Sequence, residues 1–193
     1  MAMRTLNKQG AKSTVTNTTA HTTTSSTSVS ESISADFPVV MVANLSQLQV
    51  GIPVSFNYPL EETPNILVKL GQQAQGAVGP DQDIVAYSQI CQHMGCNYGF
   101  VAAGSSPACE VSTTYKASGP VGYCCCHGSI YDYANGGKVI GGPAPRPVPS
   151  VILSVDSPTG NIYATGMSPP TIFGYDTGSN DVSNDLHGGT LVS

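Results

Sequence analysis

The sequence predicts an all-β protein built as an antiparallel β-sandwich of about ten strands. Short segments rich in β-branched and aromatic residues recur along the chain and are bounded by turn residues. Glycine (21) and proline (14) are plentiful among the 193 residues, and there is no tryptophan. This composition favours a turn-rich β protein over a helical bundle.

The N-terminal segment lacks the residues of a folded core. Serine and threonine make up 15 of the 22 residues in 13–34. The burial of so few apolar groups cannot offset the conformational entropy that the segment would lose on folding. We therefore predict that residues 1–36 form a flexible tether. A disordered end without a role has the same composition. Arg4, Lys8 and Lys12 precede this tract and could mark the flank of a membrane anchor, which we expect to be missing from this sequence.

The predicted domain covers residues 37–166. It opens with the apolar run Phe37–Ala43, and Asn44–Gly51 allows one helical turn before a glycine. The candidate strands that follow are Ile52–Phe56, Asn65–Leu70, Asp83–Ser88, Glu110–Tyr115, Val121–Cys124, Ile130–Tyr133, Lys138–Ile140, Val151–Val155 and Asn161–Ala164. Asn135–Gly137 is a candidate hairpin turn. Residues 167–193 are polar and glycine-rich, and are either a C-terminal arm on the domain or disordered.

Charge and hydropathy exclude two classes of protein. Only 10% of residues are charged and the net charge is −5, so the chain has no basic stripe for nucleic acid. No apolar run approaches the ~18 residues that a membrane-spanning helix needs.

All six cysteines lie within residues 91–126, and five of them belong to two boxes that also contain a histidine. Cys91–Cys96 reads C-x-H-x-G-C, and Cys124–Ser129 reads C-x-C-H-G-S. A thiolate and an imidazole this close on one loop are typical of a metal site. Ordinary disulfides with two incidental histidines are one alternative. A Cys₂His₂ zinc site is another, but one cysteine and one histidine from each box suit a two-iron centre better.

The two boxes are similar to the Rieske motifs C-x-H-x-G-C and C-P-C-H-G-S, and the sequence resembles a Rieske iron–sulfur protein. The resemblance implies the Rieske fold, with a small cluster-binding subdomain at one tip over about residues 89–146. It also implies one [2Fe–2S] cluster. Its ligands would be Cys91 and Cys124 on one iron and His93 and His127 on the other. Cys96 and Cys126 would form a disulfide between the two loops.

Three features resemble the high-potential branch that oxidises quinol in cytochrome bc-type complexes. Ferredoxin-like Rieske domains lack the loop disulfide that Cys96 and Cys126 would form. Ser129 would donate a hydrogen bond to a bridging sulfide and Tyr131 to a ligand sulfur, and both bonds would raise the potential. Gly141–Pro145 resembles the family's Pro loop, in which Pro143, Ala144 and Pro145 would form a rigid cover.

The sequence departs from the family pattern at the second box. Cys125 stands where the family usually has proline, and the 27 residues between the boxes contain Cys109. We expect these two cysteines to form a second disulfide. Two free thiols or another pairing remain open, because spacing alone does not fix connectivity. Met94 replaces the leucine common in the first box and is still apolar.

The resemblance implies a one-electron carrier that accepts an electron and a proton from a membrane quinol and passes the electron to a cytochrome or oxidase. His127 would contact the quinol, and His93 would be the second exposed imidazole. Met94, Gly95 and Pro143–Pro145 would form an exposed apolar rim that docks on a cytochrome b-like subunit. The alternatives are a soluble Rieske ferredoxin, a small electron-transfer subunit of another oxidoreductase, and a zinc or disulfide module without redox activity.

Composition also suggests where the protein works. A surface with few charged groups changes little in acid, and disulfides persist in oxidising surroundings. We therefore expect the outer face of the plasma membrane of an acidophilic archaeon, with archaeal Rieske proteins of terminal oxidase complexes as relatives. Attachment would be through the N-terminal anchor.

Overall fold

A computed structural model describes residues 37–110, 113–169 and 190–193. The predicted tether and most of the predicted C-terminal arm therefore lie outside the described residues. The described part contains ten strands and one three-residue 3₁₀ helix, η1 (Leu45–Gln47), which confirms the predicted all-β fold. No helix in these ranges has the length and apolarity needed to cross a membrane.

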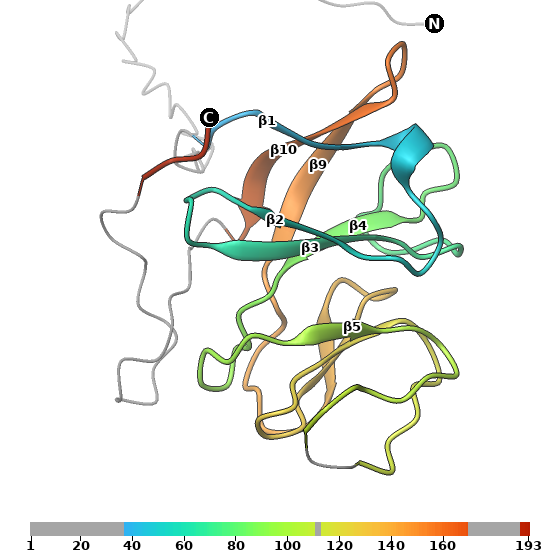
Figure 1. Cartoon of the computed structure of the whole chain (residues 1–193), viewed down its shortest axis with the longest axis vertical. Coiled ribbons are helices and arrows are strands. Elements are labelled where there is room, and N and C mark those ends of the chain that lie inside the picture. Colours follow the sequence, from blue (N-terminus) through green and yellow to red (C-terminus); the bar gives the residue numbers. More distant parts are fainter. Residues whose placement is uncertain (1–36, 111–112, 170–189) are drawn as a thin grey trace, which may run out of the picture. The chain divides into compact units, whose positions relative to one another are not determined.

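The larger sheet has six antiparallel strands in the order β1-β10-β9-β4-β3-β2 (Figure 1). They are β1 (Val40–Asn44), β10 (Asn161–Ser168), β9 (Ser150–Asp156), β4 (Ile84–Ser88), β3 (Pro64–Lys69) and β2 (Val54–Asn57). Alternate residues of these strands face one apolar core, which includes the fully buried Leu67, Ile84 and Ile162. This sheet is the base on which the second sheet is mounted.

The smaller sheet has four antiparallel strands in the order β5-β6-β7-β8: β5 (Gly99–Val101), β6 (Val121–Tyr123), β7 (Ile130–Asp132) and β8 (Lys138–Gly141). The hairpin between β7 and β8 turns at Gly136 and Gly137, whose φ angles are 67° and 70°. Positive φ at two successive positions favours glycine, so the turn predicted at Asn135–Gly137 is confirmed.

A cluster of buried tyrosines joins the two sheets. The Tyr87 hydroxyl on β4 donates to the carbonyl oxygen of Tyr133 at 3.1 Å, and the two ring centroids lie 4.6 Å apart. The chain leaves the larger sheet after Ser88 and returns at Pro149, where the Ser88 N–H donates to the Pro149 carbonyl at 2.9 Å. The four-stranded sheet and its loops are therefore inserted at a single point of the six-stranded sheet.

The structure differs from the predicted strands most clearly at three places. No described residue of Glu110–Tyr115 is in a strand, because Tyr115 stacks on Tyr123 of β6 and does not pair with a neighbouring backbone. β5 was not predicted, because it has only three residues and begins with Gly99. β10 continues to Ser168, four residues beyond the predicted strand, because it pairs with β9 as far as Ser150.

Candidate metal centre

The first box forms a tight loop between β4 and β5. The Cys91 N–H donates to the Cys96 carbonyl, and the Gly95 N–H donates to the Cys91 carbonyl, each at 2.9 Å. Gly95 has a φ of 74°, a conformation that side chains disfavour. The glycine of the C-x-H-x-G-C motif is thus required by the turn that brings the two cysteines together.

The second box, between β6 and β7, repeats this geometry. The Cys124 N–H donates to the Ser129 carbonyl at 2.9 Å, and the Gly128 N–H donates to the Cys124 carbonyl at 2.8 Å. Gly128 has a φ of 75°. In both loops the glycine is the fourth residue after a buried cysteine, so the two cysteines occupy equivalent places.

These two equivalent cysteines are the free thiols among the described residues, and both are buried. The Cys91 sulfur lies 3.2 Å from the Tyr131 hydroxyl. The Cys124 thiol, and more weakly Tyr131, hydrogen bonds to Cys91 and lowers its pKa to about 5 against the opposing effect of burial. A thiol held close to its anionic form is suited to bind a soft metal ion.

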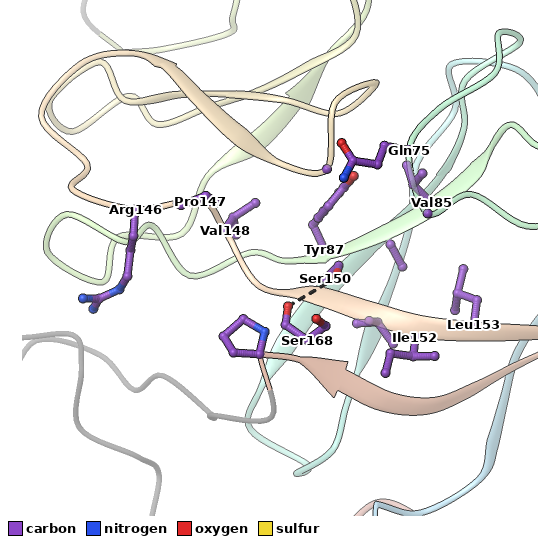
Figure 2. A pocket seen from close by; sticks show the side chains of 15 residues that line it. Gln75, Val85, Tyr87, Arg146, Pro147, Val148, Ser150, Ile152, Leu153 and Ser168 are labelled. Carbon is purple, nitrogen blue, oxygen red and sulfur yellow. Dashed lines mark hydrogen bonds between the residues drawn. The ribbon is translucent and has the colours of Figure 1, made fainter. Parts of the chain in front are cut away.

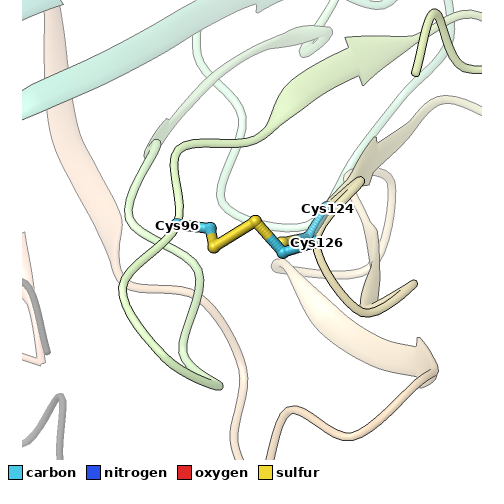
Figure 3. Close-up of side chains that lie close together, drawn as sticks. All are labelled: Cys96, Cys124 and Cys126. Atoms are coloured by element: carbon cyan, nitrogen blue, oxygen red, sulfur yellow. A yellow bond between two sulfur atoms is a disulfide. The ribbon is translucent and has the colours of Figure 1, made fainter. Parts of the chain in front are cut away.

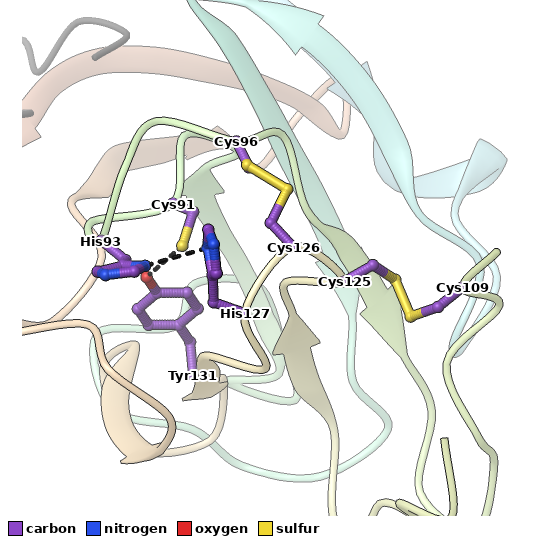
Figure 4. Close-up of a disulfide and its surroundings, with 8 residues drawn as sticks. All are labelled: Cys91, His93, Cys96, Cys109, Cys125, Cys126, His127 and Tyr131. Carbon is purple, nitrogen blue, oxygen red and sulfur yellow. Dashed lines mark hydrogen bonds between the residues drawn. A yellow bond between two sulfur atoms is a disulfide. The ribbon is translucent and has the colours of Figure 1, made fainter. Parts of the chain in front are cut away.

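The histidines of the two boxes face one another. His127 is exposed, but His93 is half-buried, which corrects our expectation of a second exposed imidazole. Their Nδ1 atoms lie 3.3 Å apart and their rings are nearly perpendicular, at 89° (Figure 4). Two imidazoles that direct the same ring nitrogen to one point are able to hold one metal ion. His93 and His127 therefore complete a set of four candidate ligands with the two free thiols.

Another group of sulfur atoms looks like a metal site but cannot be one. The sulfur atoms of Cys96, Cys124 and Cys126 all lie within 4.8 Å of one another (Figure 3). Cys96 and Cys126 are joined in a disulfide, so neither sulfur is available as a thiolate ligand.

The structure contains both disulfides considered from the sequence. Cys96–Cys126 joins the two loops, and Cys109–Cys125 ties the segment between β5 and β6 to the second loop (Figure 4). Cys109 also packs with Val101 and Val121 in a small separate core. The second disulfide therefore anchors this segment next to the candidate ligands.

The family model of the Rieske [2Fe-2S] domain matches residues 39–152, which contain both loops. The chain belongs to the Rieske family. It is accordingly a Rieske electron-transfer protein, whose cofactor is a [2Fe–2S] cluster with cysteine and histidine ligands.

Several known proteins resemble this Rieske chain. The iodate reductase subunit IdrB of Denitromonas iodatirespirans is 38% identical over 144 residues, covering 74% of this chain and 69% of the relative. The cytochrome bc1 complex Rieske iron-sulfur subunit of Streptomyces lividans is 33% identical over 75 residues, covering 39% of this chain and 36% of the relative. The soluble domain of the Rieske protein II (soxF) from Sulfolobus acidocaldarius superposes with a TM-score of 0.59 and 36% identity, covering 75% of this chain and 83% of that one.

The donor set fits a Rieske cluster. Two buried, unpaired thiols in equivalent loop positions suit one iron, and two histidines with facing Nδ1 atoms suit the other. A Cys₂His₂ zinc site uses the same residue types, so the fit depends on the family as well as on the ligands.

The expected apolar rim of the Rieske site is only partly exposed. Pro143 and Pro145 are exposed and Met94 is half-buried, but Gly95 and Ala144 are buried, which corrects our expectation. Gly95 is buried because its N–H closes the first loop. Ala144 is 7% exposed because it packs in the buried core with Cys91 and Cys124.

The Pro loop is fixed directly on the second box. The Ala144 N–H donates to the Ser129 hydroxyl oxygen at 3.2 Å, which leaves the Ser129 proton free to donate elsewhere. A Cβ at Gly142 would lie 2.3 Å from the Gly128 carbonyl oxygen, so only glycine allows this contact.

Two residues near the site, Gln92 and Arg146, belong to no motif that predicted a role for them. Gln92 is fully buried between two candidate ligands, and its side-chain oxygen accepts from the Arg146 Nε at 3.0 Å. The available signal was Arg146 itself, an isolated cation between prolines in a chain with seven lysines and arginines.

Proposed function

We propose that this Rieske protein accepts single electrons from a membrane quinol and passes them to a cytochrome or oxidase. The observation that carries the proposal is the asymmetry of the site. The two free thiols are buried, whereas His127 is exposed and His93 is half-buried, with their Nδ1 atoms 3.3 Å apart. A donor can therefore approach His127 directly.

The proposal assigns Cys91 and Cys124 to one iron and His93 and His127 to the other. When bound, the cluster supplies a one-electron acceptor. The Tyr131 hydroxyl lies 3.2 Å from the sulfur of Cys91 and would donate to it as a thiolate ligand, and Ser129 has a proton to donate. Hydrogen bonds to sulfur stabilise added negative charge, which supports a high reduction potential.

The proposal assigns the contact with quinol to His127. Its Nδ1 is directed towards His93, which leaves Nε2 to accept a hydrogen bond from a quinol hydroxyl and to hold the proton released there. Met94, Pro143 and Pro145 supply apolar surface that excludes water around this contact. The same surface would dock on a cytochrome b-like subunit.

A second candidate is electron transfer within a larger oxidoreductase, without contact to quinol. The iodate reductase subunits IdrB of Denitromonas iodatirespirans and of Pseudomonas sp. (strain SCT) align with 74% and 78% of this chain. The bc1 subunit of Streptomyces lividans aligns with 39%. Under this reading the exposed His127 faces a partner redox subunit.

Mixing with a quinol distinguishes the candidates. The oxidised, cluster-containing protein is mixed anaerobically with a short-chain quinol, and the visible absorbance of the cluster is followed. Ascorbate, a reductant without a quinol ring, is the control. Reduction by both supports the quinol proposal, whereas reduction by ascorbate alone supports the second candidate. A colourless protein that contains zinc would overturn both.

We also propose that the protein works outside the cytoplasm, attached to the membrane through its N-terminal region. The support is the pair of disulfides in one small domain, since such bonds are rare in reducing compartments. Mass spectrometry of protein from its native source, alkylated before reduction, should find both pairs oxidised. Modified free cysteines at these four positions would contradict the location.

A further inference from the structure

Gln92 lies between two proposed ligands and is 0% exposed. Three of its polar groups have partners. Its backbone N–H donates to the Tyr131 hydroxyl at 2.8 Å, its side-chain nitrogen donates to the Ile90 carbonyl at 3.0 Å, and its side-chain oxygen accepts from Arg146 at 3.0 Å. Breaking any of these bonds would leave a buried polar group unsatisfied, which is costly.

Arg146 comes from the opposite side of the site. It lies between Pro145 and Pro147, whose rings fix the backbone on both sides. With Pro147 and Val148 it lines a pocket of about 570 Å³, whose other lining residues include members of β4 and β9 (Figure 2). The Pro loop contacts the second box through Ala144, and Arg146, the residue that follows the loop, contacts the first box.

The bonds of Gln92 determine the direction of the Tyr131 hydroxyl. An N–H group can only donate, so the Tyr131 oxygen accepts from Gln92 and its single proton is left for another acceptor. The Cys91 sulfur lies 3.2 Å from that oxygen. The position of the Gln92 peptide therefore decides whether the phenol donates to this sulfur.

We propose that Arg146 is a positioning residue for the redox centre. Its guanidinium holds the Gln92 side chain, Gln92 holds the Tyr131 oxygen, and Tyr131 donates to the Cys91 sulfur. The relay stabilises the reduced state and raises the reduction potential. It rests on the Rieske cofactor and is independent of whether the electron donor is a quinol.

The test is a double-mutant cycle read by the reduction potential. Arg146→Met is made in the natural sequence and in a Tyr131→Phe background, and each protein is titrated with visible circular dichroism. If Arg146 acts through Tyr131, Arg146→Met lowers the potential in the natural sequence and has no further effect in the Tyr131→Phe background. An equal drop in both backgrounds would show a direct charge effect and overturn the relay.

Hydrogen exchange supplies a readout that does not depend on electron transfer. In Arg146→Met, the backbone amide of Gln92 should exchange about tenfold faster, because its hydrogen bond loses support. The amide of Cys124, in the second loop, is the internal control and should be unchanged. An unchanged Gln92 amide would also overturn the proposal.

Arg146→Lys is a second variant in case Arg146→Met does not assemble a cluster. It keeps the positive charge but replaces the planar guanidinium with an ammonium. The relay predicts a lower potential and faster Gln92 exchange in this variant as well. A potential equal to that of the natural protein would assign the effect to charge alone.

Discussion

Gly95 and Gly128 occupy the same place in two different loops. Each donates its N–H to the carbonyl of the cysteine four residues earlier, and their φ angles are 74° and 75°. The two boxes differ in the spacing of histidine, yet their backbones close in the same way. This shared closure places Cys91 and Cys124 in equivalent, buried positions.

Tyr131→Phe should lower the reduction potential while the fold is preserved, because the phenol is buried and phenylalanine keeps its shape. A differential hydrogen-bond energy of about 1 kcal/mol corresponds to roughly 40 mV for one electron, so the drop should be on the order of 50 mV. A redox titration measures it. Tyr163→Phe removes a hydroxyl from β10 of the other sheet and is the matched control. Equal potentials in all three proteins would contradict the role of Tyr131.

Gly142→Ala should disrupt the contact between the Pro loop and the second box. Its Cβ would lie 2.3 Å from a backbone oxygen, and its φ is 77°. Gly104→Ala is the control, since Gly104 has a φ of 78° but open space around its Cβ. We expect Gly104→Ala to cost about 1–2 kcal/mol from backbone strain alone. Gly142→Ala should cost clearly more and should lose visible absorbance on storage, as urea unfolding and spectroscopy would show. Equal losses of unfolding free energy in the two variants would mean that the Pro loop moves away from the second box at little energetic cost.

Replacing Cys109 and Cys125 together by serine should destabilise the domain without removing the cluster. The bond closes a loop with a sequence separation of 16, which in the chain-entropy account is worth about 3 kcal/mol. Urea unfolding under non-reducing conditions measures the loss. Serine at both Cys96 and Cys126 is the comparison, and it should release the cluster faster because that bond joins the two ligand loops. Similar rates of cluster loss for the two double variants would show that both bonds support the site.

Stability should fall in alkali because of buried tyrosines. Burial raises the pKa of Tyr58 from 10.0 to about 12. Below pH 10 the Tyr58 hydroxyl keeps its proton in both the folded and the unfolded chain, and its contribution to stability is complete. Between pH 10 and 12 the hydroxyl loses its proton in the unfolded chain first, so the free energy of unfolding falls by up to about 2.7 kcal/mol. Urea unfolding at pH 8 and pH 12 would show a smaller fall for Tyr58→Phe. At pH 8 this variant should be about 1 kcal/mol less stable, because it loses the bond to the Pro38 carbonyl. An equal fall in both proteins would mean that Tyr58 ionises in the folded state.

The strands and the four candidate ligands could be predicted from the sequence because their signals are local. β-branched segments between turn residues mark strands, and a histidine beside a cysteine marks a ligand loop. The burial of Ala144 could not be predicted in this way, since it depends on how the Pro loop packs against the second box. The burial of Gly95 could not be predicted either, because it depends on how the backbone of the first loop closes. The bond between Gln92 and Arg146 joins residues 54 positions apart, and no local pattern reports such a pair.

The insertion point between Ser88 and Pro149 has a consequence for how this site could change over evolution. All four candidate ligands lie on one continuous stretch, which leaves and rejoins the larger sheet at residues joined by a backbone hydrogen bond. A stretch whose two ends already meet can be exchanged as a unit, with little rearrangement of the scaffold that receives it. The six-stranded sheet can therefore stay unchanged as the scaffold, while the inserted segment that sets the redox properties is exchanged.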